Sequence, residues 1–130
     1  MHKHLSSTFL KFFLIACFYT YIRSIITYIL SKKKWKTVVT HNPDGEYGHI
    51  HHQMTSYIVR KDSRVDMNQL VYFGKYYRKK NMPKNLNSIS SSDLKKKMKL
   101  TGMYSSQSKV MDHLGHMLPH ENWVKAKDWR

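Results

Sequence analysis

The stretch FFLIACFYTYIRSIITYILSKKKWK, residues 12–36, decides how this chain is organised. Its apolar run covers about 22 residues from residue 9 to residue 30, and an α-helix of that length is about 33 Å long. Such a helix crosses the hydrocarbon core of a bilayer. No glycine or proline interrupts the run, and only Lys11 and Arg23 carry charge within it. The sequence therefore predicts a transmembrane helix over residues 9–31, preceded by a flank of residues 1–8.

Three alternatives to a retained membrane helix stay open at this stage. A secretory signal peptide would end at a small-residue cleavage site, which the bulky TYILSKKKW segment does not offer. A mitochondrial transit peptide agrees with the lack of any acidic residue before Asp44, but such peptides are amphipathic rather than uniformly apolar. A buried helix of a soluble protein would need a larger body around it than this chain provides.

Positive charges in and after the apolar run predict how it would sit in a membrane. An arginine at the centre of a membrane helix costs about 2.5–3.5 kcal/mol, so Arg23 either extends to the headgroups or faces another helix or a lipid phosphate. Lysines are denser after the run than before it, which predicts the cytoplasm or the mitochondrial matrix for the C-terminal side. The predicted contacts with lipid or with a neighbouring helix are Arg23, Lys32, Lys33, Lys34 and Trp35.

The rest of the chain is poor material for a hydrophobic core. The 130 residues carry a formal charge of +15, and the segments after the apolar run are largely polar or basic. This charge indicates an acidic partner: anionic lipid, an acidic protein surface or nucleic acid. Cys17 is the only cysteine, which leaves no disulfide framework and no cysteine-based zinc site. The expected fold is mainly α and non-globular, with residues 32–130 forming a basic tail that a partner orders.

Local patterns within the tail predict short elements. The sequence NPDG at residues 42–45 is strong turn chemistry between β-branched and alternating segments, and it predicts a β-hairpin. Residues 63–81 have helical spacing of apolar positions and a capping-box-like start at Ser63 and Asp66. The linker NMPKNLNSISSSD follows, and then two short helices that end at Gly102 and before Pro119.

No motif in the chain predicts catalysis. The serines lie in linker-like runs without a nucleophile elbow, and neither GxGxxG nor a P-loop is present. The histidines are the strongest candidates for a chemical site. The residues considered as metal ligands are His49, His51 and His52, which lie close to His41 in the sequence. Histidines at the surface or at an interface are the simpler interpretation. The prediction is therefore a non-enzyme without metal or cofactor.

Aromatic and basic residues of the tail predict contacts with a partner. Trp and Arg are enriched where protein interfaces hold their binding energy. The predicted contact residues are Tyr72, Phe73, Tyr76, Tyr77, Arg78, Trp123 and Trp129. The segment YFGKYYRKK also suits RNA, but it lacks the order of an RNP1 motif, so nucleic acid is not the favoured partner.

These features together predict a non-catalytic, single-pass accessory subunit that stabilises a large membrane complex and is not a stand-alone monomer. The mitochondrial inner membrane, in a complex of the respiratory-chain or ATP-synthase type, is the expected place, with the tail on the matrix side and another intracellular membrane as the other choice. The rival hypothesis is a soluble basic scaffold on an acidic lattice, such as mitochondrial ribosomal RNA or the tubulin of ciliary microtubules.

Overall fold

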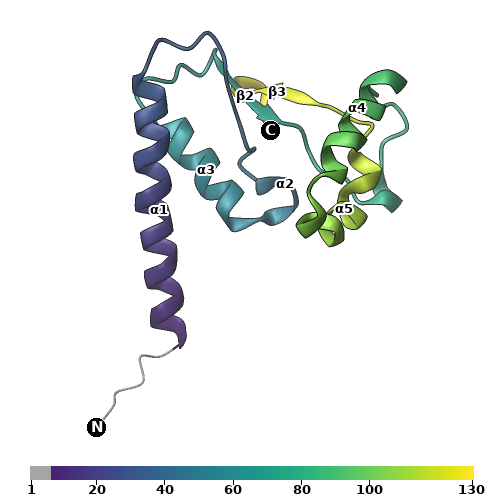
Figure 1. Cartoon of the computed structure of the whole chain (residues 1–130). Coiled ribbons are helices and arrows are strands. Elements are labelled where there is room, and N and C mark those ends of the chain that lie inside the picture. The colour runs from purple at the N-terminus through teal and green to yellow at the C-terminus, as the bar shows by residue number, and fades with distance from the viewer. Residues whose placement is uncertain (1–6) are drawn as a thin grey trace.

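The computed structural model describes residues 7–130 of the chain, which is mainly helical with one small mixed sheet. Figure 1 shows the long helix α1 on one side, a central part with the sheet and the C-terminus, and the helix pair α4 and α5 on the far side. The elements in chain order are α1 (Ser7–Ser31), β1 (Val38–Thr40), α2 (Gly45–Gly48), α3 (Ile50–Lys61), β2 (Leu70–Phe73), α4 (Ser91–Gly102), α5 (Ser108–Leu114) and β3 (Trp123–Lys125).

The sheet joins three short strands that are far apart in the sequence. Its order is β1-β2-β3; β1 runs parallel to β2, and β3 runs antiparallel to it. A parallel pair needs a crossover, which α2 and α3 supply. The predicted hairpin is therefore wrong, although the NPDG turn is present with a hydrogen bond from Gly45 N–H to the Asn42 carbonyl. Residues 50–61 become a helix because Met54, Ile58 and Val59 share one apolar face, and two of them are buried.

A small hydrophobic core lies where α3, the sheet and the C-terminal end meet. Leu70 and Tyr72 of β2 are 0% and 1% exposed, and they pack with Val59 and with Ala126. Partly buried residues from other elements cover this cluster: Ile26, Val38, Val65, Met67 and Trp129. The expectation of a wholly non-globular tail is therefore corrected for the part that forms this core.

The helix predicted for residues 63–81 is also absent. Asp66 does not cap a helix; its carboxylate accepts a hydrogen bond from Asn68 N–H at 2.8 Å, and its carbonyl accepts from Gln69 and Leu70 N–H. This turn leads into the LVYF strand, whose β-branched and aromatic side chains suit a half-buried sheet. In residues 70–73, backbone hydrogen bonding with β1 and β3 outweighs the local helical spacing of the apolar residues.

Close contact between two backbones follows directly after β2. Gly74 N–H donates to the Asn122 carbonyl at 2.6 Å, and a Cβ at residue 74 would lie 2.4 Å from the Asn122 Cβ. Only glycine fits such an approach without displacing the chain. Gly74 thus fixes the position of residues 120–123, which line the cleft described below.

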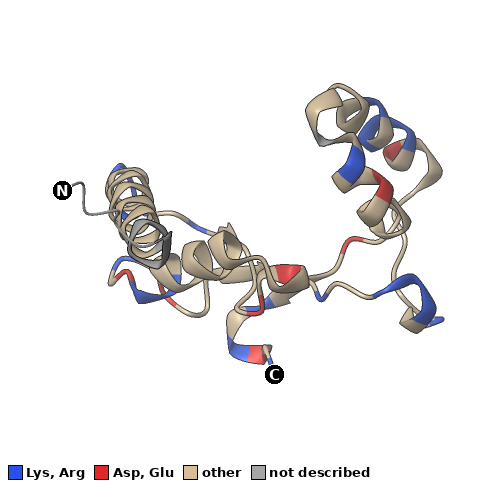
Figure 2. Cartoon of the chain, turned by 90° about the horizontal axis from the view of Figure 1, so that it is seen from below, with Lys and Arg blue, Asp and Glu red and all other residues tan. Residues whose placement is uncertain are grey.

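The two helices expected near the C-terminal end are confirmed. Ser90 caps α4, because its hydroxyl accepts from Asp93 N–H at 3.1 Å, and α4 ends at Gly102 as predicted. The Ser90 hydroxyl and the Lys96 ammonium hold the pKa of Asp93 below its usual value. Figure 2 shows basic residues spread over these outer segments, whereas residues 12–31 of α1 contain a single charged residue, Arg23.

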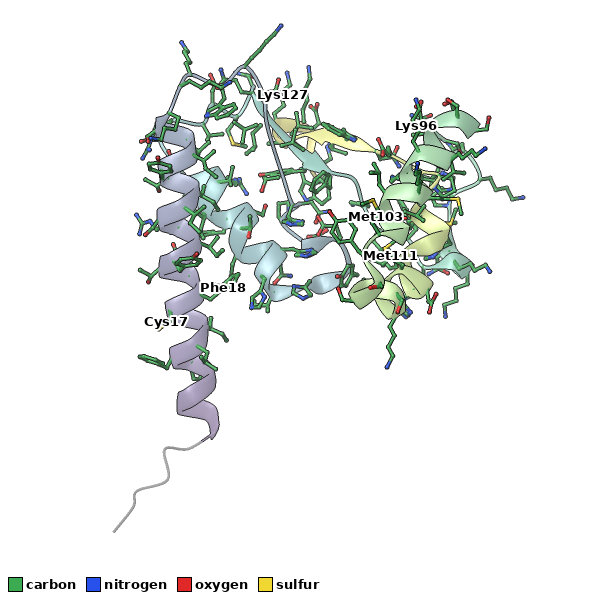
Figure 3. The ribbon with its side chains drawn as sticks, in the orientation of Figure 1. Cys17, Phe18, Lys96, Met103, Met111 and Lys127 are labelled. Carbon is green, nitrogen blue, oxygen red and sulfur yellow. The ribbon has the colours of Figure 1, made fainter. Side chains whose placement is uncertain are left out.

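Helix α1 is long and apolar enough to cross a membrane, and 6% of its most apolar window is buried within the chain. Exposed apolar residues run along it: Phe12, Phe13, Leu14, Ile15, Tyr21, Ile25, Tyr28 and Ile29. From Phe18 onward, one side of α1 is covered by α3. Phe18 stacks on His51 at 4.1 Å between ring centroids, and Arg64 Nη1 donates to the Thr27 carbonyl at 2.9 Å. Figure 3 shows Phe18 on the α3 side and Cys17 on a side that α3 leaves open.

Candidate functional site

Two histidines and one glutamate converge beside the crossover between β1 and β2. His41 follows β1, Glu46 belongs to α2 and His52 to α3. Nδ1 of His41 lies 3.0 Å and Nδ1 of His52 2.5 Å from the same carboxylate oxygen, Glu46 Oε2. The two imidazole rings stack at 3.8 Å between centroids with 12° between their planes. One potential ligand atom of each of the three residues therefore lies within 4.8 Å of the others.

The second oxygen of Glu46 is held by the backbone of Asn42. Asn42 N–H donates to Glu46 Oε1 at 3.1 Å, and Glu46 N–H donates back to Asn42 Oδ1 at 3.0 Å. Asn42 is fully buried, and its Nδ2 donates at 3.1 Å to the carbonyls of both Phe73 and Gly74. The carboxylate is thus oriented by a side chain that is itself fixed to the end of β2.

The backbone at Glu46 is in a conformation that L-residues rarely adopt. Its φ is 56°, and the neighbouring glycines Gly45 and Gly48 also have positive φ, 67° and 91°. A non-glycine residue held there costs of order 1–3 kcal/mol unless its surroundings impose it. The hydrogen bonds from Asn42, His41 and His52 are the interactions that impose it here.

Partial burial and hydrogen bonding shift the pKa of the Glu46 carboxylate in opposite directions. Burial alone would raise the pKa of Glu46, but hydrogen bonds from His41, from Asn42 N–H and from His52 together lower it below the usual value. Glu46 is therefore the carboxylate form at neutral pH. Burial lowers the pKa of His52, and the hydrogen bond to Glu46 opposes that effect only in part. Neutral imidazole, the form that binds metals, is thereby favoured at His52.

A cleft of about 580 Å³ opens beside these three residues. Its near wall holds His41, Glu46 and His52 together with aromatic rings, and its far wall is mainly apolar, with Val110, Leu114 and Met117. Phe73 and Trp123 lie edge to face between the two walls, with 6.3 Å between ring centroids. The cleft thus combines apolar side chains with two sets of polar groups, the convergent His41, Glu46 and His52 and the ion pair of Lys97 with Glu121 at 2.8 Å, and such a combination is typical of binding sites for small ligands.

The residues predicted as partner contacts divide into three groups. Phe73 and Trp123 expose 40% and 56% of their surface, and Arg78 is exposed, so a partner can reach them. Tyr76 and Tyr77 are half-buried. Tyr72 is a core residue, with Trp129 packed edge-on against it at 5.6 Å, so the prediction of a contact surface for Tyr72 is corrected. Tyr72 and Trp129 therefore pack β2 against the C-terminal segment and do not face a partner.

The residues predicted to contact lipid lie in the C-terminal half of α1 or directly after it. Arg23 faces a hollow between α1 and α3 that Lys61 and Arg64 also line. Lys33 lies over the Trp35 ring at 4.2 Å, and Trp35 Nε1 donates to the Ile29 carbonyl at 3.2 Å. Lys32 likewise covers Tyr28 at 3.8 Å. Two cation–aromatic pairs therefore lie at the C-terminal end of the apolar helix.

Of the histidines considered from the sequence, only His52 joins the three-residue cluster. The His51 ring stacks on Phe18 instead, and the His49 ring lies 4.5 Å from that of His52 without joining the convergent atoms. Sequence reasoning missed Glu46 and left His41 out of the set. The available signal was an acid placed between histidines on either side of a strong turn, in a chain with only 8 acidic residues.

Replacing Asn42 with alanine is expected to destabilise the fold by at least about 2 kcal/mol. The change leaves the Glu46 N–H and two carbonyls at the end of β2 without their partner, and an unsatisfied buried polar group costs about 1–3 kcal/mol. Denaturant unfolding of the full chain in detergent measures the effect. The exposed Asn85→Ala is the control and should change stability by less than about 0.5 kcal/mol. Equal effects of the two changes would contradict this role for Asn42.

No family model, no curated protein and no solved structure matches this chain.

Proposed function

We propose that this protein is a non-catalytic, single-pass accessory subunit that stabilises a large membrane complex. The observation that carries the proposal is α1, a long apolar helix whose surface is almost entirely left uncovered by the rest of the chain. Exposed apolar area of this extent is unfavourable in water, and monomeric soluble proteins rarely leave such a patch uncovered. Lipid tails or the helices of partner subunits are the surroundings that suit it.

The contact between α1 and α3 sets the depth of α1 in the membrane. Helix α3 carries Gln53, Arg60 and Lys61 along the second half of α1, and polar side chains of this kind do not enter hydrocarbon without partners. Arg23, Lys61 and Arg64 lie together at that level. We therefore place Arg23 and Lys61 at the lipid phosphates, where each gains about 1 kcal/mol from anionic lipid. Arg64 lies at the same level but is already paired with Asp62 at 3.1 Å.

The part of α1 before Phe18 would then lie in the bilayer without cover from the rest of the chain, because α3 packs on α1 from Phe18 onward. Residues 7–17 form a helix of about 17 Å, which is shorter than the hydrocarbon thickness of about 30 Å. Local thinning of the bilayer and the helices of partner subunits would accommodate this mismatch. Arg23 would thus lie at the membrane surface, so the cost of a charge at the membrane centre would not apply to it.

Partner subunits would contact the surfaces that the chain leaves uncovered outside the membrane. Exposed apolar side chains outside α1 include Met98, Leu100, Met103, Tyr104 and Trp123, on a tail whose charge is strongly positive. Acidic protein surfaces with apolar anchoring pockets fit this combination. The matrix side of the mitochondrial inner membrane is our first choice of place, because the first 43 residues carry no acid and the tail is basic.

Gentle solubilisation of native membranes tests this function. The full chain is expected to migrate with a complex many times larger than its own 15.6 kDa, and Trp123→Ala should weaken that association by about 2 kcal/mol or more, roughly 30-fold. The exposed Lys125→Ala, two residues further along β3, is the control. Migration as a free monomer in mild detergent would contradict the proposal, and release by ribonuclease would favour the scaffold on an RNA lattice.

A further inference from the structure

We propose that His41, Glu46 and His52 bind a divalent first-row transition-metal ion, with Zn²⁺ as the ion to test. This site is independent of the membrane proposal, because all three residues belong to the crossover between β1 and β2. Two imidazoles and one carboxylate are a ligand set of known zinc sites and of non-haem iron sites. Hard cations such as Mg²⁺ prefer an all-oxygen shell, so they are expected to bind weakly here.

The distances between the ligand atoms suit one metal ion. An ion bound at about 2.0–2.2 Å by each ligand in tetrahedral or octahedral geometry holds those ligand atoms about 3–3.5 Å from one another. Nδ1 of His41 and Nδ1 of His52 lie 3.0 and 2.5 Å from Glu46 Oε2, and all three atoms lie within 4.8 Å of one another. Metal binding moves the proton of each Nδ1–H to Nε2, the other nitrogen of the neutral ring, and small side-chain rotations would then bring the three atoms to a common ion.

The surroundings of the carboxylate provide the support that metal ligands need. Ligating carboxylates are themselves hydrogen-bonded, and the loss of such a partner lowers metal affinity about 10–100-fold. Asn42 N–H fixes Glu46 Oε1, which leaves Oε2 directed at the two histidines. Asn42 is in turn fully buried and anchored to the carbonyls of Phe73 and Gly74.

Three protein ligands leave at least one coordination position for water or a bound molecule. The cleft of about 580 Å³ adjoins the cluster and gives that position access from outside. His49 is the residue that offers a fourth protein ligand, since its ring centroid lies 4.5 Å from that of His52. The number of nitrogen ligands therefore distinguishes an open site with two histidines from a closed site with three.

Titration of the untagged full chain in detergent with Zn²⁺ tests the proposal, with Co²⁺ as the spectroscopic probe. We expect one equivalent of Zn²⁺ to bind at least about 100-fold more tightly than Mg²⁺, and Co²⁺ to give visible absorption bands of low coordination number. The metal-bound chain should also unfold at a higher temperature than the metal-free chain. X-ray absorption of the zinc-loaded chain should show two histidine nitrogens and oxygen in the first shell.

Glu46→Gln and His52→Ala should each weaken Zn²⁺ binding by more than about 100-fold, which exceeds the effect of losing a supporting hydrogen bond. Matched controls make comparable changes away from the cleft: the exposed Asp112→Asn and His113→Ala on α5. Both controls should bind as the wild type does. The proposal would be overturned if the wild type bound Zn²⁺ no more tightly than Mg²⁺, a result that does not depend on how any variant folds. Equal effects of the ligand variants and the control variants on Zn²⁺ affinity would also overturn it.

Discussion

The double substitution Leu14→Asp and Ile15→Asp should release the protein from membranes. Both side chains are exposed apolar residues in the first half of α1, so the change removes no packing within the chain. An aspartate at the centre of a membrane helix costs about 2.5–3.5 kcal/mol, and two of them lower the membrane-bound fraction by roughly four orders of magnitude. Carbonate extraction followed by sedimentation measures this fraction directly.

The same chemical change outside α1 is the control for this experiment. Leu100→Asp with Met103→Asp replaces two residues that are 60% and 74% exposed on and beside α4. These positions lie outside the proposed membrane segment, so the control protein should stay in the membrane pellet. If both double variants left the membrane pellet to the same extent, the added acids would act through solubility alone. The first half of α1 would then not be the membrane anchor.

Leu70→Ala should have the largest effect on the stability of the folded tail. Leu70 is fully buried at the centre of the core, and truncation of such a leucine costs about 2–5 kcal/mol. A small domain has only about 5–15 kcal/mol of stability in total, so much of the sheet is expected to be unfolded. Denaturant unfolding monitored by tryptophan fluorescence measures the change, because Trp129 lies against the neighbouring Tyr72.

Tyr72→Phe is the matched control at the adjacent core position. The Tyr72 hydroxyl is buried and finds no hydrogen-bond partner among the described residues, and burial raises its pKa. Removing it should leave stability unchanged or increase it slightly, since a buried hydroxyl without a partner is itself unfavourable. A cost below about 1 kcal/mol for Leu70→Ala would show that β2 does not form the centre of the core.

Local signals in the sequence predicted the elements that depend on local interactions. Helix α1 follows from an uninterrupted apolar run, and α4 from a serine cap and a terminal glycine. The same kind of reasoning failed between residues 50 and 73. There the partner of β1 is β2, about 30 residues further along, and non-local pairing of this kind leaves no local pattern. The helical spacing after Ser63 was real, but the LVYF segment is more stable as the central strand.

The candidate metal site could be predicted only in part. A group of histidines beside a strong turn was visible, and His52 was among the residues considered. Glu46 points toward His41 and His52 because its backbone has a positive φ, which sequence rules do not assign to a glutamate. Asn42 has its role through contacts with Phe73 and Gly74, more than 30 residues away. Residues of this kind become visible only when the fold brings the segments together.

Aqueous thiol labelling of single cysteines tests most directly the central claim that lipid surrounds the first half of α1. In a Cys17→Ser background, Leu14→Cys and Met103→Cys place one thiol each at positions that the chain itself leaves 57% and 74% exposed. In inside-out vesicles of native membranes, which expose the matrix face, the account predicts rapid labelling at residue 103 and none at residue 14 until detergent is added. Equal labelling of both cysteines before detergent would contradict it, because water and not lipid would then surround α1.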